Sequence, residues 1–184
     1  MTTNREPVPA YVAAYGAGMV ISVLGDRWLE SAALCGSIRR GVHYVGDADL
    51  VVVAKPEVAE DFAANLPLLL ESVTGAREVG KGNRHNQVVL DALGFEVKVD
   101  VWVVPAESLG AAMMYATGPA RLNIAQRCHA DALGLKLNQY GLYRVEKDSD
   151  PPGRMVKIAG KTEREVYDAL GMTWLEPEER ERKR

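Results

Sequence analysis

The sequence predicts an α+β fold in two parts, because strand-like and helix-like segments alternate and Pro105 interrupts the pattern. Strands are short apolar or alternating runs, and helices open at features such as Pro56 or the capping box of Thr162 and Glu165. In the first part, residues 1–105, the expected elements are helices over 10–24 and from 56 toward 73, and strands over 31–35, 49–54, 77–79, 87–90 and 95–104. In the second part, residues 106–184, they are helices over 107–116, 119–133 and from 162 toward 171, and a strand pair over 136–145 and 155–159.

The composition is that of an ordinary globular chain. With 184 residues and 47% hydrophobic content, it can bury one sizeable core or two small lobes. The uncharged run over 7–25 contains two prolines and falls short of the apolar length of a membrane span, so a core helix and no membrane partner are expected. Cys35 and Cys128 lie in apolar surroundings, which favours buried reduced thiols and a cytoplasmic location.

Three aspartates stand in or beside two predicted strands. Asp47 and Asp49 are two residues apart before an apolar run, so they project to the same side; Asp100 alternates with valines. If the strands are neighbours, three carboxylates converge above an apolar core and need cations, and oxygen ligands suit Mg²⁺. Two such ions about 3.5–4 Å apart serve in-line displacement at phosphorus. The pattern therefore predicts a phosphoryl-transfer enzyme.

A glycine-serine pair precedes the aspartates at a strand-to-helix junction. Gly36 and Ser37 alone would indicate only a helix cap, although free backbone N–H groups at a helix start also attract phosphate. With Arg40 and the two aspartates following, a triphosphate site is favoured.

These segments together resemble the DNA polymerase X family. The resemblance lies in five motifs in order between about residues 31 and 179: the glycine-serine segment with Asp47 and Asp49, the strand of Asp100, the segment from Tyr115 to Pro119, and two C-terminal segments at 135–142 and 166–172. It implies a nucleotidyltransferase palm with a mixed sheet over 1–105, and a smaller thumb-like domain over 106–184 that binds nucleotide and DNA. The chain is similar to small viral and phage-like members reduced to these two domains.

The resemblance implies a role for each motif residue. Asp47 and Asp49 would bind two Mg²⁺ or Mn²⁺ ions, and Asp100 would bind the catalytic ion and help to take the proton from a primer 3′-hydroxyl. The implied nucleotide contacts are Gly36, Ser37 and Arg40 at the phosphates, Tyr115 and Gly118 at the sugar, and Asn123 and Arg127 at the base edge and template. Lys98 stands where relatives carry a basic residue near Asp100. A simple cross-strand salt bridge explains Lys98 nearly as well as a role in the site.

The implied activity is DNA-directed DNA synthesis from dNTP, filling gaps in DNA repair as a monomer. The alternative is a template-independent nucleotidyltransferase acting on a nucleic-acid end or a small molecule. The net charge of −3 argues against DNA binding, but a local basic face matters more. Candidates for that face are Arg39, Arg40, Lys81, Arg84, Lys98, Arg121, Arg127, Lys136 and Arg144.

Other features depart from the family or carry no expected role. Trp102 and Ala116 stand where polymerase beta has Arg and most relatives have Phe, which puts sugar selection in question. His85 shows no ligand spacing and is expected to be incidental, or to lie near DNA. The charged end over 179–184 is expected to fray into solvent.

Overall fold

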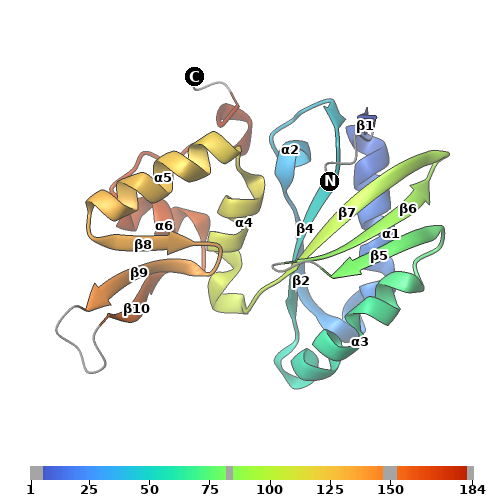
Figure 1. The fold of residues 1–184 in the computed structure, drawn as a ribbon, viewed down its shortest axis with the longest axis horizontal. Coiled ribbons are helices and arrows are strands. Elements are labelled where there is room, and N and C mark those ends of the chain that lie inside the picture. The colour runs from blue at the N-terminus through green and yellow to red at the C-terminus, as the bar shows by residue number, and fades with distance from the viewer. Residues whose placement is uncertain (1–5, 82–84, 147–152, 182–184) are drawn as a thin grey trace. The chain divides into compact units, whose positions relative to one another are not determined.

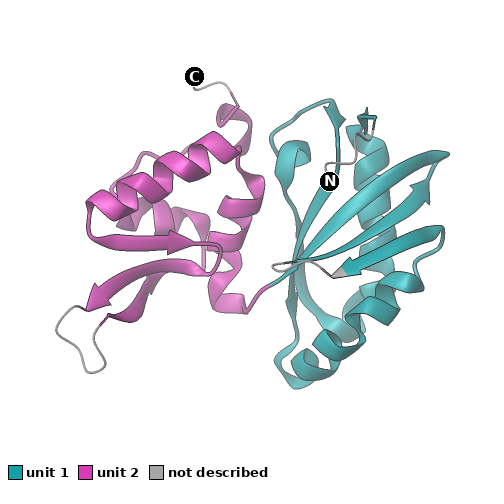
Figure 2. Ribbon diagram, in the orientation of Figure 1, with its two compact units in different colours: residues 1–103 teal, residues 104–184 magenta. Residues whose placement is uncertain are grey.

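The chain divides into two compact units, residues 1–103 and 104–184, in a computed structural model (Figure 2). The structure describes residues 6–81, 85–146 and 153–181. The division falls close to Pro105, where the sequence interrupts its strand pattern. It does not decide the roles predicted for the two parts, which stay predictions.

Unit 1 is built around a five-stranded sheet in the order β2-β4-β7-β6-β5 (Figure 1). Strands β4 and β7 are parallel and the other neighbours are antiparallel, so the sheet is mixed, as predicted. The elements of unit 1 are β1 (Val8–Pro9), α1 (Ala10–Trp28), β2 (Leu29–Leu34), α2 (Gly36–Arg39), β3 (Tyr44–Val45), β4 (Ala48–Ala54), η1 (Pro56–Val58), α3 (Ala59–Glu71), β5 (Ala76–Lys81), β6 (Asn86–Ala92) and β7 (Phe95–Val103).

Helices α1 and α3 cover one face of this sheet (Figure 1). The valines of β7 at 97, 99 and 101 are buried in that core, together with Ala48, Leu50 and Val52 of β4. Because successive side chains of a strand point to opposite faces, the residues between them point to the face away from α1. Asp49, Lys98, Asp100 and Trp102 therefore share that second face.

The turn between β6 and β7 sets their register. Leu93 and Gly94 both have positive φ angles, 51° and 84°, as a two-residue hairpin of the primed type requires. Ala92 then pairs with Phe95, and Gln87 pairs with Asp100. Helix α1 has one irregularity, at Gly25 (φ 56°), close to where the predicted helix ends.

Unit 2 combines three helices with an antiparallel sheet in the order β10-β9-β8. Its elements are η2 (Ala106–Ser108), α4 (Leu109–Thr117), α5 (Ala120–Ala132), β8 (Leu135–Asn138), β9 (Gly141–Glu146), β10 (Arg154–Ala159), α6 (Glu163–Ala169) and η3 (Pro177–Glu179). Its separate core includes Met114, Leu142 and Tyr167. The predicted capping box is present: Thr162 accepts from the Glu165 N–H, and Glu165 accepts from the Thr162 N–H.

The single strand predicted over 136–145 is instead the hairpin β8–β9. The Asn138 Oδ1 atom accepts a hydrogen bond from the Tyr140 N–H at 2.8 Å, which is the side-chain turn that asparagine favours. The chain therefore reverses at Gln139 and Tyr140. Most of the loop predicted after this strand lies outside the described residues.

Two smaller expectations are wrong. Cys128 is exposed on α5, whereas Cys35 is buried as expected, and neither forms a disulfide within the described residues. The expected fraying over 179–184 does not begin at residue 179, since Arg180 is buried and pairs with Glu163 at 2.9 Å, while residues 182–184 lie outside the described part of the chain. Over the described ranges, no helix is both long and apolar enough to cross a membrane.

Candidate active site

Asp49 and Asp100 lie side by side on neighbouring parallel strands. They are paired directly in the register of β4 and β7, and both point away from the core that α1 covers. Asp47 stands just before β4 on the same side of the strand pattern. The two aspartate-bearing strands are therefore neighbours, which is the condition under which the sequence brings the three carboxylates together.

The loop before β4 approaches Asp49 so closely that only glycine fits there. Gly36 begins α2 with a φ of 65°, and a Cβ atom added to it would collide with the Asp49 carboxylate. The Cys35 N–H donates to the Asp49 carbonyl oxygen at 2.7 Å and fixes the approach. Glycine is thus required both by backbone conformation and by lack of space.

Ser37 and Arg40 lie in and just after α2, next to this glycine. Both are partly exposed, and the Arg40 N–H donates to the Gly36 carbonyl oxygen at 3.3 Å. The strand-to-helix junction predicted at this place is present, but α2 has only four residues. Their assignment to the phosphates stays a prediction.

Lys98 occupies the space between two of the carboxylates. Its Nζ atom donates to Asp100 Oδ2 at 2.7 Å and lies 3.7 Å from Asp47 Oδ2. Burial lowers the pKa of Lys98, but the hydrogen bond to Asp100 and the charges of Asp100, Asp47 and Asp49 together raise it above its ordinary value. Lys98 therefore carries a full positive charge in the site.

The three carboxylates act on one another electrostatically. Burial, followed by the charges of Asp47 and Asp100, raises the pKa of Asp49 from 3.8 to about 7. A hydrogen-bonding interaction with Trp102 and the charge of Lys98 oppose this rise. Asp49 is therefore a carboxylate whose negative charge needs more compensation than the protein supplies.

The carboxylate oxygens of Asp47, Asp49 and Asp100 are suitable ligands for a divalent ion such as Mg²⁺, but the three groups are not arranged around one position. Within the described part of the chain, no three Asp, Glu, His or Cys side chains lie close enough together to hold one metal ion. The Lys98 ammonium group contacts both Asp47 and Asp100 at their Oδ2 atoms. Asp49 and Asp100 fit as a carboxylate pair for a metal ion. Asp47 fits as a third ligand if it gives up its contact with Lys98 and binds the metal ion instead.

His85, which the sequence interpretation left without a role, lies against this site. Its ring stacks on Trp102 with centroids 4.5 Å apart and planes at 27°, and its Nε2 atom is 3.4 Å from Asp100 Oδ1. The signal was present in the sequence. Counting back through the hairpin from the turn at Leu93 and Gly94 places His85 opposite Trp102, one position beyond the pair of Asn86 and Val101.

The remaining predicted nucleotide contacts belong to unit 2. Gly118 ends α4 with a φ of 63° and is buried, and Asn123 Nδ2 donates to the Tyr115 carbonyl oxygen at 2.7 Å. Arg127 is exposed one turn further along α5. Tyr115, Gly118 and Asn123 are thus brought together by the junction of α4 and α5, while their contacts with nucleotide stay predictions.

Some of the basic residues expected to face nucleic acid are engaged within the protein. Arg121 Nη2 donates to the carbonyl oxygens of Arg180 and Glu181 at 3.1 and 2.5 Å, and Lys136 pairs with Asp131 at 2.8 Å. Arg84 and the Lys81 side chain lie outside the described residues. Arg121 is therefore better explained as a structural residue than as a DNA contact.

Comparisons with known proteins agree with this fold. The family described as DNA polymerase beta thumb matches residues 112–181. Two structures of Leishmania infantum polymerase beta, a ternary primer–template complex and a ternary gap complex, align with TM-scores of 0.74 and 0.73 at 22% and 21% identity. Each alignment covers 95% of this chain, and they cover 77% and 71% of the respective Leishmania chains.

Similar proteins are found in sequence as well. DNA polymerase lambda of Rattus norvegicus is 29% identical over 161 residues, which is 80% of this chain but only 28% of the rat protein. Repair DNA polymerase X of African swine fever virus is 25% identical over 164 residues, covering 89% of this chain and 86% of the viral protein. The chain thus spans little more than a quarter of the rat relative and most of the viral one.

The fold is therefore that of the polymerase beta-like nucleotidyltransferases, with a mixed sheet in its first unit and a thumb in its second. The resemblance to the DNA polymerase X family, predicted from the motifs, is confirmed by these relatives.

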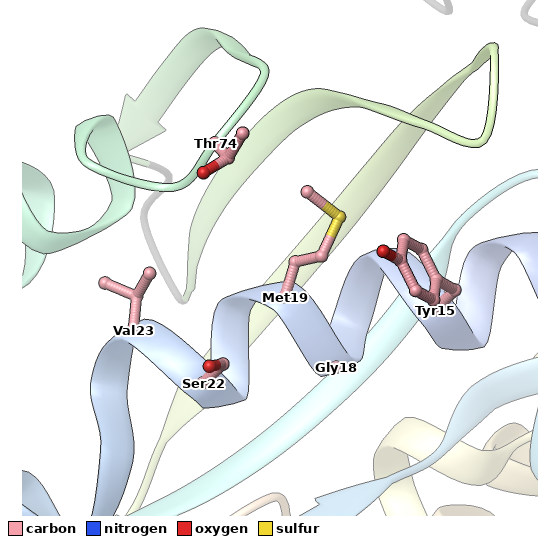
Figure 3. Close-up of a pocket in the computed structure, with 6 residues that line it drawn as sticks. All are labelled: Tyr15, Gly18, Met19, Ser22, Val23 and Thr74. Atoms are coloured by element: carbon pink, nitrogen blue, oxygen red, sulfur yellow. The ribbon is translucent and has the colours of Figure 1, made fainter.

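A pocket of about 510 Å³ lies elsewhere in unit 1 (Figure 3). It is lined by one side of α1 and by the segment before β5, at Tyr15, Gly18, Met19, Ser22, Val23 and Thr74. Figure 3 shows the side chains of Tyr15 and Met19 rising from α1, with Thr74 on the segment across from it. None of these residues belongs to the motifs, so the pocket is separate from the carboxylate site.

Proposed function

We propose that this protein is a DNA-directed DNA polymerase that adds dNMP from dNTP to a primer 3′-hydroxyl. The observation that carries the proposal is the direct pairing of Asp49 with Asp100 on parallel strands, with Asp47 just before the first of them. Gly36 lies so close to the Asp49 carboxylate that a Cβ atom at this position would collide with it. The names of the relatives, repair DNA polymerase X and DNA polymerase lambda, support gap filling in DNA repair as its setting.

Asp47, Asp49 and Asp100 are the residues that would hold two divalent ions, Mg²⁺ or Mn²⁺. Such ions, when bound, polarise phosphate oxygens and lower the pKa of a coordinated hydroxyl. The protein's own part is to place carboxylates at a desolvated edge of the sheet, where burial, followed by the charges of Asp47 and Asp100, raises the pKa of Asp49 to about 7. Asp100 orients the primer hydroxyl and helps to accept its proton.

Each unit carries its own proposed nucleotide contacts. Gly36 and Ser37 offer backbone N–H groups to the phosphates, and Arg40 adds positive charge beside them. In unit 2, Tyr115 and Gly118 pack against the sugar. Asn123 and Arg127 contact the minor-groove edge of the new base pair, where purine N3 and pyrimidine O2 are common acceptors. Such contacts test the shape of the pair rather than its identity.

The proposed partner is gapped or primer–template DNA, bound by a monomer in the cytoplasm. The ternary gap complex of the Leishmania protein supports this choice of substrate. Binding is expected to weaken with salt, because phosphate contacts dominate affinity for DNA.

The test is extension of a duplex with a single-nucleotide gap, using each dNTP separately with Mg²⁺ or Mn²⁺. Incorporation that follows the template base supports the polymerase. Equal incorporation of all four nucleotides would instead favour the template-independent transferase. The matched control is Asp49→Asn, which removes a proposed metal ligand and should lose incorporation while retaining the fold.

A further inference from the structure

Gln126 is a fully buried polar residue of unit 2 with no visible function in the fold. It lies on α5, where Ala130 is the next buried residue one turn later, and its side chain has no exposed area. Neither its Nε2 nor its Oε1 atom has a hydrogen-bond partner among the described residues. An amide buried without partners is costly, and an apolar residue would fill this place at less cost.

Gln126 lines a small cavity. Its volume is about 10 Å³, and its walls are Met114, Tyr115, Asn123, Gln126, Arg127, Leu137 and Asn138. That volume is close to the room needed by a single water molecule, and a buried water typically makes about three hydrogen bonds. The amides of Gln126, Asn123 and Asn138 and the Arg127 guanidinium are groups of the right kind to supply them.

The same cavity joins Gln126 to the two residues proposed to test the base pair. Asn123 is held at one end, since its Nδ2 atom donates to the Tyr115 carbonyl oxygen at 2.7 Å. Arg127 is exposed and follows Gln126 directly in sequence. Gln126 is therefore a buried polar residue of α5 that lines one cavity together with both of these side chains.

We infer that Gln126 is a specificity-determining positioning residue, whose amide binds one water molecule in this cavity and thereby fixes the orientation of Asn123 and Arg127. The inference rests on the proposed polymerase function. Burying the amide lowers the stability of the fold, but it fixes the orientation of the side chains that contact the minor-groove edge. These side chains distinguish a correct base pair from an incorrect one.

The experiment compares wild type with Gln126→Met, which has a similar volume but no amide, on a gapped duplex. We expect the ratio of kcat/KM for the correct dNTP to that for an incorrect dNTP to fall by about tenfold or more. The melting temperature should stay close to that of wild type, because methionine fills a similar volume and the cost of burying the amide is removed together with its hydrogen bonds to the water. The control is Gln139→Met, the same chemical change in the turn after β8 and outside the cavity, which should keep the ratio.

A second readout does not depend on activity. In the ¹⁵N–¹H spectrum of wild type, the Gln126 side-chain amide should be protected from exchange and show a contact to a bound water. The Asn123 side-chain amide resonance should shift in Gln126→Met and not in Gln139→Met. Unprotected Gln126 without a water contact, or a ratio within twofold of wild type, overturns the inference. Loss of template-directed incorporation by wild type would instead contradict the proposed function, and the spectra would still decide the role of Gln126.

Discussion

Lys98 and Asp100 form an ion pair on one strand, with the Lys98 Nζ atom 2.7 Å from Asp100 Oδ2. The same ammonium group lies 3.7 Å from Asp47 Oδ2, so one cation serves two of the three carboxylates. Burial, followed by the charges of Asp47 and Asp100, raises the pKa of Asp49 to about 7. Lys98 thus supplies positive charge at the place where metal ions are proposed to bind.

The first prediction is that Lys98→Met binds Mn²⁺ more tightly than wild type, by about three- to tenfold. The lysine competes with the metal for Asp47 and Asp100, so its removal favours the ion. The measurement is titration of free Mn²⁺ by electron paramagnetic resonance. Arg77→Met is the control, since Arg77 pairs with Asp91 and Glu96 and does not contact the three aspartates. Equal or weaker binding by Lys98→Met would show that the lysine does not compete.

The second prediction concerns pH and Asp49. Its pKa is about 7 in the folded protein against an ordinary value of 3.8, so between pH 4 and 7 the folded state holds a proton that the unfolded state has lost. Stability therefore falls as pH rises through this window, and the loss is complete above pH 7. Asp49→Asn escapes it. In EDTA, we expect the variant to match wild type at pH 4 and to be more stable at pH 8, on the order of 1–4 kcal/mol.

Thermal unfolding with EDTA at both pH values is the measurement. Asp91→Asn makes the same change at an exposed aspartate that is paired with Arg77, so it should gain no stability at pH 8. Added Mg²⁺ should stabilise wild type at pH 8 and should have a smaller effect on Asp49→Asn. If Asp49→Asn is no more stable than wild type at pH 8, ionisation of Asp49 does not destabilise the folded protein.

Much of the site could be predicted from the sequence, because strand periodicity alone fixes which residues share a face. Asp100 and its neighbours Lys98 and Trp102 follow from alternation with buried valines. The pairing of Asp49 with Asp100 needed the order of strands, which was supplied by the resemblance rather than by periodicity. The part that Lys98 plays, holding Asp47 and Asp100, depends on side-chain conformations that no pattern encodes.

The misses have physical reasons. The hairpin of β8 and β9 was overlooked because its turn is made by a side chain, Asn138, inside an otherwise strand-like run. The burial of Arg180 was overlooked because a charge run at a chain end is usually solvated. Its partners, Glu163 and the aromatic rings of α6 and the segment after it, become neighbours only in the folded unit.

The third prediction is that Asp100→Ala loses at least about 10²-fold in kcat while its affinity for dNTP stays largely intact. Asp47 and Asp49 remain to hold the metal of the nucleotide, whereas the group that orients the primer hydroxyl is gone. Single-turnover rates and dNTP titration separate the two effects. Asp91→Ala, another carboxylate of the same sheet, should retain its rate. Extension by Asp100→Ala near the wild-type rate would contradict the three-carboxylate assignment.

The fourth prediction separates the two contacts of His85. His85→Phe keeps a ring to stack on Trp102 but loses the nitrogen that lies 3.4 Å from Asp100 Oδ1. The two atoms are within ion-pair distance, so kcat should fall by about tenfold or more if the nitrogen positions Asp100. His85→Ala should fall further, because the stack is lost as well. The measurement is kcat on the gapped substrate, and a fully active His85→Phe would limit His85 to packing.

The last prediction tests the C-terminal segment of unit 2. Arg180 has no exposed side-chain area, and its Nη1 atom lies 2.9 Å from Glu163 Oε1. Its guanidinium carbon lies 5.7 Å from the ring of Tyr167 and 5.3 Å from that of Trp174, and its Nε donates to the Leu175 carbonyl oxygen. Replacing Arg180 takes its positive charge away from the buried Glu163 carboxylate. Arg180→Ala should therefore destabilise the protein by about 3–5 kcal/mol.

Arg164→Ala is the matched control for this arginine. Arg164 also lies over Trp174, at 5.0 Å, but it is exposed on α6, so its loss should cost less than about 1 kcal/mol. Urea unfolding of the two variants beside wild type gives both values. Adding Glu163→Gln to the Arg180→Ala variant should recover part of its lost stability, because the side chain at position 163 is then uncharged. If Arg180→Ala costs no more than Arg164→Ala, the buried pair does not hold the chain end in place.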